Sequence, residues 1–217
     1  LESSFDTQGQ SINLDGDFAA VDLTNTVATV DSIRINTLDS FTGSASDDSV
    51  IVKDNNLDFV GGAGDDRLTI DFSNYSEYSW YDNYSATLSV EGNIDGGTGS
   101  DTLAFSNAGY DSNRIIDLSK AVFSNIETIE TGNKTIIVTS SQKESVTFSG
   151  TGSVYTKDEN GVLHGTSGDD NYSGDGTGQF NPGAGDDSVS DVSTVYIDSN
   201  RDEFEVLSET MFTVEHT

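Results

Sequence analysis

The stretch that decides the fold is Gly61-Gly62-Ala63-Gly64-Asp65-Asp66-Arg67-Leu68-Thr69, and it recurs in full as Gly96-Gly97-Thr98-Gly99-Ser100-Asp101-Thr102-Leu103-Ala104. Both fit a nonapeptide GGxGxDxUx, in which U is a large apolar residue. Residues 43–51, 165–173 and 182–190 fit most of the same pattern. Such repetition is typical of folds in which one small unit stacks on the next.

The spacing of the repeats indicates how the units would stack. The starts at residues 43 and 61 differ by 18, which is two nonapeptide lengths, and the starts at 165 and 182 differ by 17. A flattened coil takes about two nine-residue units, and residues one coil apart then lie about 4.8 Å apart, the spacing of paired strands. We therefore expect each turn to lie on the turn before it.

Each position of the nonapeptide has a physical reason. Glycine supplies positive φ and turns its carbonyl inward, the sixth-position aspartate contributes a carboxylate, and the apolar eighth residue points into the core. Carboxylates and carbonyls of two stacked turns could supply the 6–8 oxygen ligands that Ca²⁺ prefers. The candidate calcium-site residues are Gly43, Asp48, Gly61, Gly62, Gly64, Asp66, Gly96, Gly97, Gly99, Asp101, Gly165, Gly168, Asp170, Gly183, Gly185 and Asp187. The fifth-position acids are expected to face solvent or to lie just outside the ion's ligands; they are Asp47, Asp65, Asp169 and Asp186.

These nonapeptides resemble the calcium-binding repeats of the RTX (repeats-in-toxin, hemolysin-type) family of secreted bacterial proteins. The resemblance implies an all-β fold, a right-handed parallel β-roll or β-helix solenoid with calcium in its turns. It also implies type I export, an extracellular or cell-surface location, and a parent protein of adhesin or surface-layer type. Two of the three partial repeats lack later glycines: residues 165–170 lack the second glycine, and residues 43–48 lack both later glycines, so we expect the carbonyl geometry of these turns to differ.

Composition agrees with a need for cations. The 217 residues hold 38 Asp and Glu against 9 Lys and Arg, a formal net charge of −29. Repulsion among the acids opposes a compact state, so a bound cation would favour folding. The same charge argues against nucleic acid as a partner and against membrane insertion. Because the chain has no cysteine, disulfides and thiolate metal sites are excluded.

Between the nonapeptides the sequence favours strands, with almost no helix. The expected strands are 27–35, 50–52, 68–72, 103–105, 115–118, 126–129, 135–139, 146–148, 192–197 and 204–207. Residues 21–24 and 30–35 resemble 116–119 and 126–131, an offset near 95 residues, and Ser124-Asn125-Ile126-Glu127-Thr128-Ile129 resembles a strand that accompanies RTX repeats. We expect two β-roll units in one continuous solenoid, residues 1–110 and a truncated 111–217.

An aromatic insertion at about residues 74–94 suggests an alternative function. Tyr75 to Tyr84 is the densest aromatic cluster and contains Trp80. It is either a loop packed on the solenoid or a platform for sugar rings, as in a carbohydrate-recognition or accessory domain of a secreted polysaccharide-active enzyme. Expected partners are therefore calcium ions, and surface glycans or neighbouring modules of the same protein.

No catalytic residues are expected. The histidines, His164 and His216, do not lie near a recognisable Ser and Asp arrangement. Arg67, the one cation within a motif turn, is better explained by pairing with nearby acids than by proton abstraction. Carboxylate pairs carry no signal because acids are so abundant.

Overall fold

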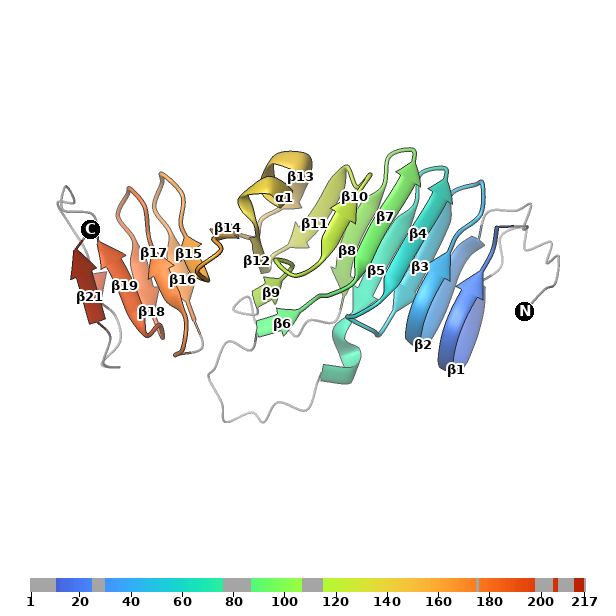
Figure 1. Ribbon diagram of the computed structural model, residues 1–217, viewed down its shortest axis with the longest axis horizontal. Coiled ribbons are helices and arrows are strands. Elements are labelled where there is room, and N and C mark those ends of the chain that lie inside the picture. The colour runs from blue at the N-terminus through green and yellow to red at the C-terminus, as the bar shows by residue number, and fades with distance from the viewer. Residues whose placement is uncertain are drawn as a thin grey trace.

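The fold was analysed in a computed structural model, which describes residues 11–24, 30–75, 87–106, 115–174, 176–197, 205–206 and 213–216. Within those residues the chain is almost all β, with one α-helix, α1 (Ser140–Ser145), and one 3₁₀ turn, η1 (Phe72–Tyr75). Its strands lie side by side in an elongated array, with β1 (Ser11–Asp22) at one end and β21 (Thr213–His216) at the other (Figure 1). The described strands pair in parallel, except that β14 (Val154–Lys157) and β15 (Val162–His164) are antiparallel.

The largest sheet has ten strands and contains two rows that run along the array. Row 1 consists of β3 (Asp48–Val52), β5 (Arg67–Asp71), β8 (Thr102–Ser106), β11 (Thr128–Gly132) and β13 (Thr147–Gly150). Row 2 consists of β4 (Asp58–Ala63), β7 (Asn93–Thr98) and β10 (Val122–Ser124). The long strand β2 (Val30–Thr42) joins the rows, since its first half pairs with β3 and its second half with β4, and β1 (Ser11–Asp22) pairs along β2.

The first three motif turns connect the two rows. Each runs from the end of a row 2 strand, or of β2, into a row 1 strand, and these turns line up along the upper edge of the array in Figure 1. From β3 to β11, strands that neighbour each other in row 1 are therefore separated in sequence by a pass of the chain through row 2.

Two further sheets complete the described fold. An eight-stranded sheet contains β6 (Thr87–Ser89), β9 (Ile115–Asp117), β12 (Thr135–Val138), β14, β15, β17 (Gln179–Asn181), β19 (Thr194–Ile197) and β21 (Thr213–His216). A three-stranded sheet contains β16 (Asn171–Ser173), β18 (Ser188–Ser190) and β20 (Glu205–Val206). The turns that lead into β16 and β18 hold the last two nonapeptides.

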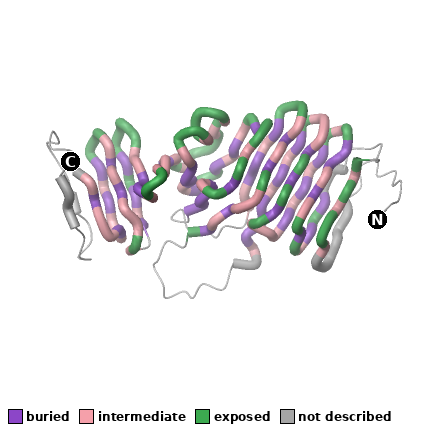
Figure 2. The backbone as a smooth tube through the Cα atoms, viewed as in Figure 1, coloured by how far each residue is buried: buried purple, intermediate pink, exposed green. Residues whose placement is uncertain are grey.

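The apolar eighth residues form columns in the core. In row 1, Val50, Leu68, Leu103, Ile129 and Phe148 are aligned in register, and the first four are buried. Buried positions alternate with more exposed ones along β3, β4 and β7 (Figure 2), as expected when one face of a sheet covers a core.

The core divides into two clusters of buried residues. The larger cluster takes residues from Ile33 to Val138, on both sides of residue 110. The smaller one contains Tyr155, Tyr172 and Phe180, with ring centroids 4.5–5.5 Å apart. The proposed division into units 1–110 and 111–217 stays a prediction.

Most expected strands are present, with shifted ends. β4 and β7 extend into the first three residues of their motifs, so Gly61 and Gly96 lie in strands rather than in loops. The helix α1 was not expected; it is six residues long, too short for a periodic signal, and Thr139 begins it with a capping box to Gln142. Residues 76–86, with most of the predicted aromatic insertion, lie outside the described residues, as do residues 27–29, 204 and 207 of the expected strands.

Candidate metal centre

The sixth-position aspartates of the first three motifs form one continuous row. The backbone N–H of Asp48 donates to Oδ1 of Asp66 at 2.7 Å, and the N–H of Asp66 donates to Oδ1 of Asp101 at 2.7 Å. The N–H of Asp101 then donates to Oε2 of Glu127 at 2.7 Å. Each carboxylate thus binds the amide of the turn before it, which places three buried acids and Glu127 along one line.

These three aspartates have buried side chains. Asp48, Asp66 and Asp101 are 1–2% exposed. Oδ2 of Asp66 and Oδ2 of Asp101 are buried and have no hydrogen-bond partner. Burial raises the pKa of Asp66 to about 7, against the hydrogen bond from the Asp48 amide, and the charges of Asp48 and Asp101 add to the increase. The pKa of Asp101 is also raised, again chiefly by burial.

The first-position glycines lie directly against these carboxylates. A methyl group built on Gly61 would lie 2.3 Å from the carbonyl oxygen of Gly96 and 2.4 Å from Oδ2 of Asp66. A methyl on Gly96 would lie 2.0 Å from the carbonyl oxygen of Asn125 and 2.6 Å from Oδ2 of Asp101. At both places a carboxylate oxygen and a carbonyl oxygen of the following pass converge on the position that the Cβ of any residue other than glycine would occupy.

Most other motif glycines are required because the turns stack closely. Gly97 has φ of 98°, and a methyl there would lie 2.0 Å from the carbonyl oxygen of Gly62. The same kind of contact, at 2.6 Å or less with backbone of a neighbouring pass, would occur at Gly43, Gly62, Gly64, Gly99, Gly165, Gly183 and Gly185. Gly168 is different, because a methyl there would meet nothing closer than 3.8 Å. Stacking alone therefore accounts for most of the glycine pattern.

The last two motifs form a separate pair. The N–H of Asp170 donates to Oδ1 of Asp187 at 2.8 Å, and both aspartates are buried. They precede β16 and β18 of the three-stranded sheet, whereas Asp48, Asp66 and Asp101 border the ten-stranded sheet. The structure thus brings the predicted aspartates together in two groups.

The fifth-position acids form a second, outer line of hydrogen bonds. Oδ1 of Asp47 accepts from the N–H of Asp65, and Oδ1 of Asp65 accepts from the N–H of Ser100, both at 2.8 Å. Asp169 and Asp186 repeat the contact at 2.9 Å. All four acids are exposed. In this line the carboxylate binds the amide of the following pass, the reverse of the inner row, so the two lines tie each turn to both neighbours.

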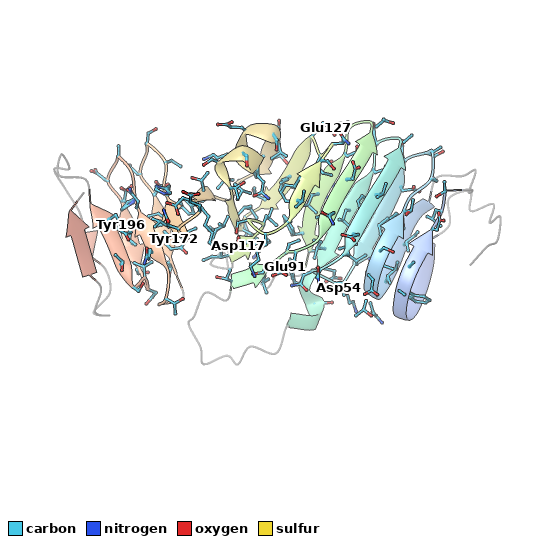
Figure 3. The ribbon with its side chains drawn as sticks, in the orientation of Figure 1. Asp54, Glu91, Asp117, Glu127, Tyr172 and Tyr196 are labelled. Carbon is cyan, nitrogen blue, oxygen red and sulfur yellow. The ribbon has the colours of Figure 1, made fainter. Side chains whose placement is uncertain are left out.

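Sequence reasoning missed Glu127 as the last member of the inner row. The turn Asn125 to Glu127 replaces a full nonapeptide turn. Asn125, with φ of 51°, takes the place of the first-position glycine of the other passes. Glu127 takes the place of their sixth-position aspartate. Figure 3 shows Glu127 at the same edge of the sheet as the motif turns. The sequence interpretation treats the segment from Ser124 to Ile129 only as a strand. The order Asn-x-Glu within this segment was the signal that could have identified Glu127.

The remaining polar candidates have structural partners. Arg67 forms two hydrogen bonds with Glu130, at 2.8 and 2.6 Å, across the intervening strand β8, which agrees with its expected pairing with an acid. Nε2 of His164 lies 3.3 Å from Oδ2 of Asp158.

The described residues contain no group of three or more His, Cys, Asp or Glu side chains placed to hold one metal ion. A cation in the inner row would therefore depend on single carboxylates combined with backbone carbonyls. No helix among the described residues is long and apolar enough to cross a membrane.

The chain was also compared with known proteins. It matches no protein-family model, no curated protein and no solved structure.

Proposed function

We propose that this chain is a calcium-binding repeat module, a parallel β-roll solenoid whose turns bind Ca²⁺ and which folds and becomes rigid when it does so. The observation that carries the proposal is Oδ2 of Asp66, a buried carboxylate oxygen with no hydrogen-bond partner that faces a carbonyl oxygen of the next pass. Such an oxygen costs free energy unless a proton or a cation neutralises it.

The chemistry of the donors favours calcium over other metals. The convergent atoms at Gly61 and Gly96 are carboxylate and carbonyl oxygens only. The chain has no cysteine, and His164 is hydrogen-bonded to Asp158. Hard oxygen ligands suit Ca²⁺, whereas Zn²⁺ and Cu²⁺ prefer nitrogen and sulfur. A bound Ca²⁺ would supply two positive charges to the inner row.

The chain's own residues would link binding to folding. The carboxylates of Asp66 and Asp101 each accept an amide from the preceding pass and lie against the glycine of their own turn, so this arrangement forms only when the passes are stacked. In the unfolded chain the excess acids repel one another. An ion that binds only the stacked turns stabilises the folded state by mass action.

The proposed setting is outside the cell. Extracellular calcium modules bind with dissociation constants of about 10⁻⁴–10⁻³ M, so the chain would remain unfolded for export and fold outside. The proposed parent is a large secreted or cell-surface bacterial protein of adhesin or surface-layer type. The carbohydrate-recognition alternative depends on residues 75–84, of which 76–84 lie outside the described residues.

Circular dichroism with and without chelator tests the proposal. We expect excess EDTA to abolish or strongly reduce the β spectrum at neutral pH, and millimolar Ca²⁺ to restore it. Mg²⁺ at the same concentration should not restore it, because Mg²⁺ needs stricter octahedral geometry and gives up water reluctantly. A β spectrum and melting temperature that are the same in EDTA and in Ca²⁺ would overturn the proposal.

The variants Asp66→Asn and Asp65→Asn form a matched pair. The two residues are adjacent and lose the same charge, but Asp66 is buried in the inner row and Asp65 is exposed in the outer line. We expect Asp66→Asn to lose most of the increase in melting temperature that Ca²⁺ produces, and Asp65→Asn to keep it. Equal loss in both would point to general charge screening and contradict a specific site.

A further inference from the structure

The inner aspartates differ in the contacts of the carboxylate oxygen that faces their own turn. Oδ2 of Asp48 accepts a hydrogen bond from the N–H of Ser44 at 2.6 Å, and Oδ2 of Asp170 accepts one from the N–H of Thr166 at 2.6 Å. Ser44 and Thr166 occupy the second position of their motifs. In these two turns the backbone itself donates a hydrogen bond to Oδ2 of the carboxylate, and we refer to them as closed turns.

The turns of Asp66 and Asp101 lack this hydrogen bond. Their second-position residues are Gly62 and Gly97, and neither donates to the carboxylate, whose Oδ2 has no partner. The N–H of Gly97 donates instead to Oδ1 of Asp95, at 3.1 Å. We refer to these two as open turns.

The sign of φ at the second position accounts for the difference. Gly62 and Gly97 have φ of 112° and 98°. In the described part of the chain, the only non-glycine residues with positive φ are Asn125 and Asp191. Ser44 and Thr166 therefore have negative φ. Rotation of the peptide plane before a residue reverses its N–H and changes the sign of its φ, which is the difference between type I and type II turns. Residues with a Cβ resist positive φ, so Ser and Thr hold the N–H toward the carboxylate.

A second contact locks the closed turns. The hydroxyl of Ser44 accepts from the N–H of Ser46 at 3.1 Å, and that of Thr166 accepts from the N–H of Gly168 at 3.2 Å. Hydroxyls that bind the amide two residues on stabilise tight turns. Glycine can make no such contact, so the open turns lack both the lock and the inward N–H.

From this contrast we propose that the second motif residue decides which turns take up a cation: the turns of Asp66 and Asp101 bind Ca²⁺, and those of Asp48 and Asp170 are closed by their own backbone and do not. The proposal rests on the calcium function proposed above. It makes Ser44 and Thr166 residues that determine site selection without touching the ion. Counting one calcium site for each of the five motif aspartates would therefore give too many sites.

Equilibrium dialysis against Ca²⁺, with each folded variant confirmed by circular dichroism, tests the selection. We expect Asp66→Asn to reduce the number of ions bound per chain by one, with Asp101→Asn as a second variant of the same kind should Asp66→Asn not fold. Asp48→Asn should leave the number unchanged. If Asp48→Asn and Asp66→Asn reduce it equally, the selection is overturned while the calcium function stands. If the unmodified protein binds no Ca²⁺, the calcium function fails, and the selection with it.

A gain of binding gives the sharper test. Ser44→Gly removes both the hydroxyl and the resistance to positive φ, so the turn of Asp48 can open, and we expect one additional Ca²⁺ per chain. Ser44→Ala removes only the hydroxyl and keeps the preference for negative φ, so it should bind the same number as the unmodified protein. No gain in Ser44→Gly, or the same gain in Ser44→Ala, would contradict control by the backbone.

Discussion

The backbone N–H of Asp66 donates to Oδ1 of Asp101, 35 residues further along the chain, at 2.7 Å. With the contacts of Asp48 to Asp66 and of Asp101 to Glu127, this bond makes the inner row one hydrogen-bonded line rather than a set of independent turns. The state of each carboxylate therefore affects its neighbours.

The close stacking of the turns predicts a large cost for a methyl group at Gly97. Gly97→Ala combines positive φ, which costs about 1–2 kcal/mol for a residue with a Cβ, with a methyl 2.0 Å from the carbonyl of Gly62. We expect a total loss of about 3 kcal/mol or more, measured by denaturant unfolding in Ca²⁺. Gly161 is the matched control, because its φ is 83° but nothing lies within 4 Å of the added methyl. Gly161→Ala should cost only about 1–2 kcal/mol; equal losses would refute the stacking argument.

The raised pKa of Asp66 predicts an unusual pH dependence without calcium. The carboxyl has a pKa of about 7 when folded, against about 3.9 in an unfolded chain, so the folded state holds the proton more tightly. Its contribution to stability is complete below about pH 4 and is lost as the pH rises through 7. In EDTA, the β signal of Asp66→Asn in circular dichroism should therefore decrease less between pH 5 and 8 than that of the unmodified protein.

Asp65→Asn serves again as the control for this pH effect. Because the carboxylate of Asp65 is exposed, the Asp65→Asn variant should show the same loss of folded structure between pH 5 and 8 as the unmodified protein. Parallel pH profiles for Asp66→Asn and the unmodified protein would show that Asp66 does not titrate in this range.

A buried ion pair is expected to secure the eight-stranded sheet. Nζ of Lys157 lies 2.8 Å from Oδ2 of Asp117, whose side chain is 7% exposed. Burial acts to raise the pKa of Asp117, but hydrogen bonds from Lys157 and Ser119 outweigh it and the pKa is lowered. Lys157→Met would leave a buried carboxylate unpaired, at a cost of about 2–3 kcal/mol, somewhat less than for a fully buried pair.

Lys120→Met provides the comparison for this ion pair. Lys120 pairs with Glu91 at 2.7 Å on the surface, where both side chains are largely exposed, so its loss should leave the denaturation midpoint almost unchanged. The ion pair of Asp117 with Lys157 contributes to stability at neutral pH, and this contribution is lost as the pH falls through the lowered pKa of Asp117. An equal effect of the two substitutions would contradict the role of burial.

Glu127 is predicted to terminate the inner row. Glu127→Ala removes the acceptor for the buried N–H of Asp101 and should destabilise the protein by about 1–3 kcal/mol. Glu127→Gln retains a side-chain oxygen at the same distance from the backbone, so it should lose less than half as much stability. Thermal denaturation of both variants measures the difference. If the two variants are equally unstable, the charge of Glu127 matters rather than the hydrogen bond.

Some of the site could be predicted from sequence because it follows from local chemistry. The nonapeptide identified the turns, since only glycine suits their backbone, and the apolar eighth residues, such as Leu68 and Leu103, identified strands that the structure contains. The difference of 18 residues between repeats anticipated the contact between Asp48 and Asp66. The strands β4 and β7 were missed because their glycines suggested loops.

The sequence by itself determined an all-β chain with repeated acidic turns, because residue type restricts φ and the apolar alternation restricts which residues face the core. Only the tertiary structure decided which passes are neighbours, because 35 residues separate Asp66 from Asp101 and 26 separate Asp101 from Glu127, and no fixed period relates them. It also decided which carboxylate oxygens the backbone satisfies. That choice depends on the direction of one N–H at Ser44 or Gly62, which becomes consequential only when stacking removes the carboxylate from water.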